Sequence, residues 1–351
     1  MLDVLLLSPL PPPVGGIARW SETVIEYFED EGTINLIHIN TSHKVKTIVG
    51  RNVFQRYISS FFQIFKLKKK IKVKLRDNSV KVAHITTSGG LGVIRDYCLI
   101  KFLNSKRIKI VYHLHFGKTP QLLESKRLTK KIFEFNLKRA TLIMAMDPIT
   151  LGCLHTYEKK VFCPNPIKKQ EFSYTKNKEI IFLGYVVKSK GIEELLKAWS
   201  EIYPCNKEWK LNIIGACNRE YRVRLEEKYN LDGVFFIGEK AHSEAMKIMK
   251  DASILVLPSY SEGFPYSICE AMFAGKAIIG SNVGAIPYLL DCECGLICKR
   301  ADYESLKEKL LLFLESEELR NSCAKKAYEK AICEIESDVV CKRYAELWKG
   351  L

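Results

Sequence analysis

Short apolar runs rich in valine and isoleucine alternate with helical patterns along the chain, and this alternation strongly limits the folds that it can adopt. Twelve such runs predict β-strands, six in each half: 3–7, 34–39, 80–85, 108–114, 141–145, 160–163, 179–184, 210–214, 234–237, 253–257, 276–280 and 295–298. Strands that alternate with helices form parallel sheets whose helices cover both faces. The chain is therefore predicted to be an α/β protein with two Rossmann-like domains.

Length and boundary signals divide these strands between two domains. A chain of 351 residues is long enough for two domains of ordinary size. We predict an N-terminal domain at residues 1–165, a polar linker at 166–178 and a C-terminal domain at 179–335. The last segment, 336–351, has apolar residues at helical spacing, and we expect a helix that packs back on the N-terminal domain.

Positive charge is concentrated in the first half of the chain. The formal net charge is +15, and residues 1–178 alone hold 31 Lys+Arg against 13 Asp+Glu, which leaves the remainder slightly acidic. Such an asymmetry indicates an acidic partner for the N-terminal domain. Anionic lipid, a pyrophosphate-linked acceptor and nucleic acid all fit this charge.

Residues 59–76, SSFFQIFKLKKKIKVKLR, contain much of that charge. Aromatic and aliphatic residues are interleaved there with basic ones, as in a helix that lies on an anionic membrane surface. A solvated helix of the N-terminal domain is the alternative. We predict that four lysines of this segment face a membrane or the acceptor: Lys68, Lys69, Lys70 and Lys72.

Hydropathy and cysteine content indicate a cytoplasmic protein. No run of 18 or more apolar residues occurs, and the first residues lack the basic region of a secretory signal. Twelve cysteines in such a chain are expected to be reduced thiols. The closest group, Cys292, Cys294 and Cys298, lacks the paired spacing and nearby histidine of a structural zinc site, so no metal is expected.

Open parallel sheets bind their ligands at the carboxyl ends of the strands, so the loops that follow strands are the candidate sites. The loop at 11–19, PPPVGGIAR, follows the first strand and precedes a helix. Gly15 and Gly16 would let backbone amides approach a diphosphate closely. A plain turn is the alternative interpretation.

A second loop, GYVVKSKG, begins at Gly184 and precedes another helix. Lys188 and Lys190 lie just before that helix, where a cation and free amides together suit a departing nucleotide diphosphate. Solvated surface lysines are the alternative.

The third loop, with its helix at 257–275, is the most specific signal. Pro265 suits the first turn of a helix and Gly275 its end, so Glu262 falls in the loop and Glu270 inside the helix. Carboxylates repel phosphates, so beside a diphosphate they suit the hydroxyl groups of a ribose and a hexose. A capping glutamate and a surface glutamate are the alternative.

The fourth segment, VYHLHFG, ends a strand of the N-terminal domain. Alternation along the strand puts His113 and His115 on the same face, and their position at the carboxyl end places at least one at the crevice. Either one is also compatible with a core histidine whose hydrogen bonds are satisfied.

Taken together, these loops resemble glycosyltransferase family 4, the glycosyl transferases group 1. The likeness is strongest from Ile180 to Asp302, where FLGYVVKSKGIEELLKA and ILVLPSYSEGFPYSICEAMFAGKAIIGSNVGAIPYLL match the family pattern. In the N-terminal domain, PPPVGGIARW and IVYHLHFG match. The resemblance implies the GT-B fold, in which the parallel sheets of two domains face a central cleft.

The resemblance also implies roles for the loop residues. His115 would lie beside the transferred sugar, Glu262 would bind the donor sugar, Glu270 the ribose and Lys190 the diphosphate. The remaining donor-binding residues would be Gly15, Gly16, Gly184, Lys188, Gly263, Phe264 and Pro265, with His113 assigned to the acceptor. The family usually has an arginine where this chain has Tyr185, and we expect Lys188 to replace that charge.

The implied reaction is retaining transfer of a hexose or derivative from a UDP- or GDP-linked donor to a glycan acceptor, without metal or other cofactor. A lipid-linked acceptor of surface polysaccharide synthesis, at the inner face of the plasma membrane, would suit the basic N-terminal domain. A nucleotide-sugar 2-epimerase of the same fold is one alternative. An anionic-polymer-binding protein is another, but it leaves Glu262 and Glu270 unexplained, and no nucleic-acid-binding motif is visible.

Overall fold

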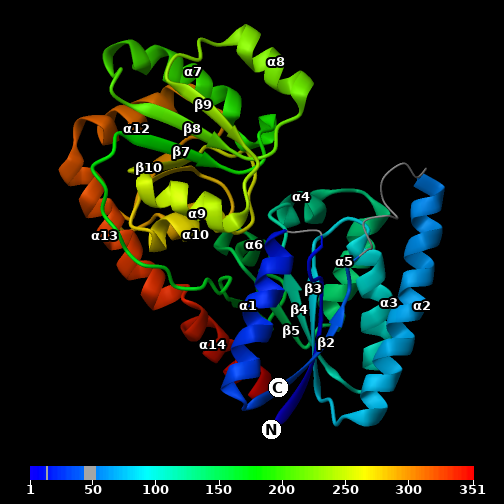
Figure 1. Ribbon diagram of the computed structural model, residues 1–351. Helices are drawn as coiled ribbons and strands as arrows, with labels where there is room; N and C mark the ends of the chain where they lie inside the picture. The colour runs from blue at the N-terminus through cyan, green and yellow to red at the C-terminus, as the bar shows by residue number, and fades with distance from the viewer. Residues whose placement is uncertain (13–14, 43–52) are drawn as a thin grey trace. The chain divides into compact units, whose positions relative to one another are not determined.

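A computed structural model of the protein describes residues 1–12, 15–42 and 53–351, with the side chains of helix α2 described from Phe62 onward. The chain divides into two compact units, Met1–Lys168 with Glu336–Leu351, and Lys169–Ile335. Each unit contains one six-stranded sheet with helices packed on it (Figure 1). The division falls between Lys168 and Lys169, within the segment 166–178 that we predicted as a linker.

The sheet of the first unit is parallel throughout and has the order β2-β1-β3-β4-β5-β6. Its strands are β1 (Leu2–Ser8), β2 (Ile34–Asn40), β3 (Val82–Thr87), β4 (Lys109–Leu114), β5 (Leu142–Ala145) and β6 (Lys160–Phe162). Successive side chains of a strand point to opposite faces, so Val4 and Leu6 enter one core cluster while Leu5 and Leu7 enter another. Burial on both faces explains why these strands are continuous apolar runs in the sequence.

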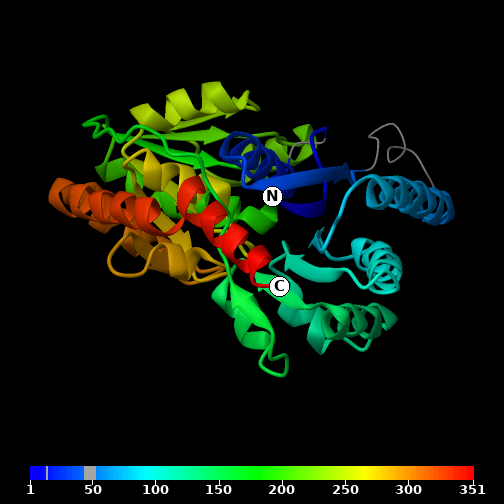
Figure 2. The ribbon, with the colours of Figure 1, turned by 90° about the horizontal axis from the view of Figure 1, so that it is seen from below.

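Helices cover both faces of this sheet (Figure 1). They are α1 (Gly16–Glu31), α2 (Val53–Asp77), α3 (Gly92–Asn104), α4 (Thr119–Glu124), α5 (Leu128–Arg139), α6 (Pro148–Cys153) and α14 (Ser337–Lys349). Core residues of α1 and α14 share one cluster, and those of α2, α3 and α5 share the other. In both ribbon views α2 lies at the outside of this unit, next to α3 (Figure 2).

The C-terminal helix α14 belongs to the first unit although the chain passes through the second unit before reaching it. Tyr344 and Trp348 of α14 are buried against Trp20 and Phe28 of α1. Trp20 Nε1 donates a hydrogen bond to the Tyr344 hydroxyl at 3.0 Å, and that hydroxyl donates to the carbonyl of Pro164 at 3.1 Å. These buried contacts hold the last helix on the face of the sheet that α1 covers.

The second unit repeats the plan with the strand order β12-β11-β10-β7-β8-β9. Its strands are β7 (Glu179–Leu183), β8 (Lys210–Ile214), β9 (Val234–Gly238), β10 (Ile254–Leu257), β11 (Ala277–Ser281) and β12 (Leu296–Cys298). Its α-helices are α7 (Ile192–Ile202), α8 (Arg219–Lys228), α9 (His242–Asp251), α10 (Tyr266–Phe273), α11 (Ile286–Leu289), α12 (Tyr303–Glu315) and α13 (Glu317–Glu334). Each of the twelve predicted strands is present, displaced by two residues at most, which confirms the two Rossmann-like domains.

A fully buried lysine, Lys276, fastens the segment that leads into the second unit. Its Nζ donates hydrogen bonds to the carbonyls of Ser173 at 3.1 Å and Lys250 at 2.7 Å. Burial lowers the pKa of this ammonium group to about 8. The two carbonyl contacts compensate in part for the lost hydration of the charge.

Within the described part of the chain, none of the helices combines the length and the apolar character that crossing a bilayer requires.

Candidate functional site

In the second unit, the strongest sequence motif forms a loop and a short helix at the carboxyl end of β10. Helix α10 begins at Tyr266, with Pro265 at the N-cap position in an extended conformation. Pro265 was predicted to lie in the first turn of this helix, and it instead directly precedes the first helical residue. Gly275, at φ +70°, follows the end of the helix as expected. Glu262 therefore lies in the loop and Glu270 inside the helix.

Glu262 is bound to Lys190 from the loop after β7. The Lys190 Nζ lies 2.6 Å from Glu262 Oε1, and the Ser259 hydroxyl donates to the same oxygen at 2.6 Å. The Glu262 side chain is only 9% exposed, and these two partners replace part of the hydration that burial removes from its carboxylate. Its second oxygen, Oε2, accepts no hydrogen bond from the residues that the structure describes. One oxygen is thus held and the other is available to a ligand.

Close backbone packing holds these two loops together. Gly191 has φ +73°, and a Cβ atom there would lie 2.0 Å from the carbonyl oxygen of Pro258. The amide of Tyr260 also donates to the carbonyl of Ser189 at 2.8 Å. Only glycine allows this approach, because the backbone of the neighbouring loop occupies the place of a side chain. Lys190 and Glu262 are therefore positioned by main-chain contacts on both sides.

A second glycine fixes the other side of the Glu262 loop. Gly284, in the loop after β11, has φ +55°, and a Cβ atom there would lie 2.2 Å from the Glu262 carbonyl oxygen. The amide of Ala285 donates to the carbonyl of Gly263 at 2.8 Å. Sequence reasoning did not single out Gly284, although the glycine follows a predicted strand as the other site loops do.

Glu270 has a partner that sequence reasoning also missed. His242 Nε2 lies 2.7 Å from Glu270 Oε1, and Glu270 is 4% exposed whereas half of the His242 side chain is exposed. His242 is the first residue of α9, in the connection that follows β9. Its place after a strand is the same signal that selected the other loops. The structure thus places a half-exposed imidazole in contact with the glutamate that is predicted to bind ribose.

The loop that contains Lys188 and Lys190 starts at Gly184, which has φ +159°. A Cβ atom on Gly215 would lie 1.9 Å from the Gly184 carbonyl oxygen, so the loops after β7 and β8 also meet backbone to backbone. Tyr185 is 62% exposed, and Lys188 is exposed at the start of a short 3₁₀ turn. Among the described ion pairs none includes Lys188, so its charge is not engaged by a carboxylate within salt-bridge distance.

In the first unit, the predicted loop at 11–19 leads into α1. Pro13 and Val14 lie outside the described residues. Gly15 is extended and is the N-cap of α1, and Gly16 is its first residue. One turn into the helix, the Trp20 ring packs on His115, with ring centroids 5.0 Å apart. The structure thus brings this loop's helix to the end of β4.

His113 and His115 do not play equivalent parts. His115 retains 8% exposure, whereas His113 is fully buried, with its Nδ1 3.0 Å from His115 Nε2 and 3.1 Å from His84 Nε2. The prediction that His113 contacts the acceptor is therefore corrected, because its ring is enclosed by the core. His84, which sequence reasoning missed, completes a cluster of three imidazoles. Burial lowers the pKa of His84 and of His115 to about 3, so both are neutral at neutral pH.

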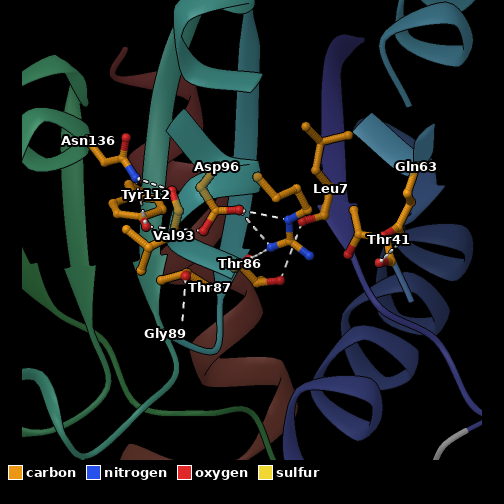
Figure 3. A network of polar contacts seen from close by, with 11 residues as sticks. Leu7, Thr41, Gln63, Thr86, Thr87, Gly89, Val93, Asp96, Tyr112 and Asn136 are labelled. Carbon is orange, nitrogen blue, oxygen red and sulfur yellow. Dashed lines mark hydrogen bonds and ion pairs between the residues drawn. The ribbon is translucent and has the colours of Figure 1, made fainter. Parts of the chain in front are cut away.

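A buried polar network stabilises the same end of the sheet (Figure 3). Asp96 of α3 is fully buried and accepts hydrogen bonds from Arg95 Nη2 at 2.7 Å and from the Tyr112 hydroxyl at 3.1 Å. Asn136 of α5 donates to the carbonyl of Val93 at 3.0 Å. Buried hydrogen-bond networks of this kind favour one arrangement of their elements, although Asn136 Oδ1 has no partner among the described residues. Here they fasten α3 and α5 to β4, the strand that ends beside His115.

Helix α2 has a buried side and an exposed side. Ile64, Leu67 and Ile71 are buried in the first unit, whereas Phe62 and Phe65 are 61% and 60% exposed. Two phenylalanines, a valine and four basic residues, all exposed and all on the side opposite the buried one, form what we call the α2 surface: Phe62, Phe65, Lys66, Lys69, Lys72, Val73 and Arg76. Of the other predicted lysines, Lys70 is exposed and Lys68 is half-buried.

Part of the chain matches the model of a known protein family. Residues 165–330 match the model of the family described as glycosyl transferases group 1. The matched segment contains every site residue described in the second unit.

Curated relatives are similar over different shares of the chain. An N,N'-diacetylbacillosaminyl-diphospho-undecaprenol alpha-1,3-N-acetylgalactosaminyltransferase of Campylobacter jejuni is 36% identical over 170 residues, 48% of this chain and 44% of that enzyme. The match therefore spans less than half of that relative. An uncharacterized glycosyltransferase of Methanocaldococcus jannaschii is 25% identical over 94% of this chain and 93% of its own length.

Solved structures resemble the whole chain. Sucrose-phosphate synthase from Thermosynechococcus elongatus has a TM-score of 0.77 at 16% identity, covering 100% of this chain and 99% of that one. Anabaena HepE in complex with UDP-glucose has a TM-score of 0.76 at 14% identity, with both chains fully covered. At such identities the likeness concerns the fold, and it confirms the predicted GT-B fold class.

Proposed function

We propose that this chain, whose residues 165–330 match the glycosyl transferases group 1, transfers a hexose or hexose derivative from a UDP- or GDP-linked donor to a glycan acceptor with retention at the anomeric carbon. The observation that supports this proposal best is the contact between Lys190 and Glu262 beside the amino end of α10. A cation, a carboxylate with one available oxygen and the amino end of a helix together suit a sugar linked to a diphosphate.

Lys190 is the residue that we assign to the leaving diphosphate. An ammonium group has three N–H donors, and the ion pair with Glu262 occupies one of them. The others remain for phosphate oxygens, to which charge moves as the bond between the anomeric carbon and the phosphate oxygen breaks. The first amides of α10 add partial positive charge at the same place. Stabilisation of that charge is the main contribution that we assign to the second unit.

The two glutamates are assigned to hydroxyl groups. Glu262 Oε1 is held by Lys190 and Ser259, so Oε2 is the oxygen that would accept a hydrogen bond from the donor sugar. His242 holds Oε1 of Glu270, which we assign to the ribose. Gly184, Gly263, Phe264 and Pro265 would shape the backbone around the donor. Gly15 and Gly16 are the residues of the first unit that we assign to donor binding.

His115 is assigned to the transferred sugar, at the end of β4. The acceptor hydroxyl would attack on the face from which the diphosphate departs, and its proton would pass to the leaving phosphate. This course requires no metal or other cofactor, because Lys190 and the helix amides supply the positive charge. Catalysis would then rest on positioning and on electrostatic stabilisation.

For the acceptor, we propose a lipid-linked glycan of polysaccharide synthesis, reached at an anionic membrane surface on the cytoplasmic side. The Campylobacter relative is named for a diphospho-undecaprenol-linked substrate. The α2 surface supports the same location, because exposed phenylalanines and basic residues share one helix side there, as interfacial helices require.

Donor binding and transfer are tested together. A thermal-shift panel of UDP, GDP, ADP and their sugars should show stabilisation by one nucleotide class, since a ligand of the folded state raises Tm. Glu262→Gln and Glu270→Gln should each lower kcat/KM by about tenfold or more, because each removes a charged hydrogen-bond acceptor. Glu227→Gln, at an exposed position on α8, is the matched control. Conversion of the donor to its epimer without any acceptor would instead identify an epimerase.

Membrane binding is tested by sedimentation with anionic phospholipid vesicles at low salt. The double variant Phe62→Ser, Phe65→Ser should bind several-fold more weakly, because the apolar part of the α2 surface is lost. Phe235→Ser, which changes an exposed phenylalanine of the second unit, is the control. The membrane proposal would be contradicted if the protein did not bind such vesicles and glycosylated only soluble acceptors.

A further inference from the structure

The three buried imidazoles of the first unit are connected to the C-terminal helix. His84 of β3, His113 of β4 and His115 all pack against the ring of Trp20, with centroid distances of 5.2, 5.4 and 5.0 Å. Trp348 of α14 donates a hydrogen bond from Nε1 to His84 Nδ1 at 3.1 Å. A continuous line of ring nitrogens therefore runs from Trp348 to His115.

The indole determines where the proton of His84 resides. An indole N–H donates and never accepts, so Nδ1 of His84 must be the unprotonated nitrogen. Burial lowers the pKa of His84 to about 3, so the ring is neutral and carries one proton. That proton must be on Nε2. His84 is therefore a hydrogen-bond donor toward its next neighbour.

The same reasoning continues along the line of nitrogens. His84 Nε2 faces His113 Nδ1 at 3.1 Å, so His113 Nδ1 accepts, and the single proton of this neutral ring is on Nε2. His115 Nε2 lies 3.0 Å from that same Nδ1. Two lone pairs would repel at this distance, so Nε2 of His115 must also carry its hydrogen. His115 is then left with Nδ1 as its only lone pair on nitrogen.

We propose that Trp348, acting through His84 and His113, holds His115 as the Nε2–H tautomer and so presents His115 Nδ1 as a hydrogen-bond acceptor for a sugar hydroxyl. The three residues are positioning residues, and the inference rests on the role proposed above for His115. Nδ1 of His115 has no hydrogen-bond partner among the residues that the structure describes. A neutral acceptor also places no positive charge beside the anomeric carbon, which becomes electron-poor as the donor bond breaks.

The arrangement leaves the Nε2 group of His113 without a hydrogen-bond partner among the described residues, and the tautomer inferred for His113 explains why. His113 Nε2 is buried and has no partner within the described residues. A buried donor without a partner is destabilising, so such groups in folded proteins call for an explanation. Here it follows from using His113 Nδ1 as the common acceptor of two imidazoles.

The tautomers are measured directly by long-range ¹H–¹⁵N correlation spectra of the full chain with ¹⁵N-labelled histidine, at neutral pH and without substrate. We expect His84, His113 and His115 all to be Nε2–H tautomers. A spectrum in which His115 or His84 is the Nδ1–H tautomer would overturn the proposal. Because the wild-type spectrum decides this, the proposal does not depend on whether any variant folds.

Variants then connect the tautomer to transfer. Trp348→Phe keeps an aromatic ring but removes the N–H donor, so we expect mixed tautomers of His84 and His115. We also expect kcat to be about tenfold lower, which is the effect of losing one positioning hydrogen bond, and KM to stay within about twofold of the wild-type value. Tyr344→Phe, on the same helix and in the same core, removes a hydroxyl that lies outside the line of nitrogens. It should leave both the tautomers and kcat unchanged.

The two proposals fail in different ways. If His115→Ala leaves transfer unchanged while the wild-type spectrum shows the expected tautomers, the assignment of His115 to the sugar is wrong. Holding His115 as one tautomer would then have no role in transfer. If transfer requires His115 but Trp348→Phe keeps the wild-type tautomers and kcat, Trp348 does not set the tautomer of His115. The proposed function would still stand.

Discussion

Lys190 Nζ lies 2.6 Å from Glu262 Oε1, although the two residues are 72 positions apart in the chain. The contact joins the loop after β7 to the loop after β10 at the carboxyl edge of one sheet. Neither charge is fully hydrated there, so each is balanced by the other. The pair is thus formed before any donor binds, and a diphosphate would meet a lysine whose position is already set.

Removal of the lysine tests this relationship most directly. Lys190→Ala removes the cation that we assign to the leaving diphosphate and leaves the nearly buried Glu262 without its charged partner. We expect kcat to fall by about 100-fold or more, as when one donor to a developing anion is removed. Ser259→Ala removes the neutral partner of the same carboxylate oxygen and should lower kcat by about tenfold or less. Equal losses in steady-state transfer assays of both variants would contradict the special role of the lysine.

Lys188 is expected to replace the charge that is missing at Tyr185. Lys188→Ala should lower kcat/KM for the donor by about tenfold, the effect of losing one charge-assisted hydrogen bond. Lys247→Ala, on α9 of the same unit, is a control for a general loss of positive charge. If Lys188→Ala leaves donor turnover unchanged while Lys190→Ala abolishes it, the replacement hypothesis is wrong.

Gly191 should not tolerate a side chain. Gly191→Ala would force a Cβ atom against the Pro258 carbonyl and keep alanine at φ +73°, so we expect a loss of about 2 kcal/mol or more in the free energy of unfolding. Urea denaturation measures this loss. Gly152→Ala, in helix α6 with nothing within 4 Å of the added methyl group, should change stability by about 1 kcal/mol at most.

Acid should destabilise the first unit through its buried histidines. Burial lowers the pKa of His84 and His115 from 6.5 to about 3, so between these values the unfolded chain binds more protons than the folded one. Their contribution to stability is therefore complete above pH 6.5 and is lost as the pH falls toward 3. The slope is at most about 1.4 kcal/mol per pH unit for each ring.

The measurement is the urea midpoint between pH 7 and pH 4. His84→Gln removes one titrating ring, and its midpoint should fall less steeply with acid than that of the wild type. His155→Gln, at an exposed position, should keep the wild-type slope. An identical slope in His84→Gln would show that the buried ring does not govern the acid response.

Local pattern was sufficient to predict the strands and the principal loops. Alternating apolar runs specify β-strands and their order along the chain, and the carboxyl ends of parallel strands meet at one edge of a sheet. Glu262, Glu270, Lys190 and His115 could be selected for that reason. Each lies after a strand or at its end, where the sequence position alone indicates the functional edge.

Partners distant in the sequence were decided only by the tertiary structure. His242 with Glu270, Gly284 with the Glu262 carbonyl, and Trp348 with His84 are contacts between separate elements, and the last pair is 264 residues apart. No periodicity encodes such contacts, because they depend on which helix packs on which face of a sheet. His113 illustrates the limit: alternation placed its side chain on the same face as that of His115, but the packing of α1 and α14 decided that it is buried.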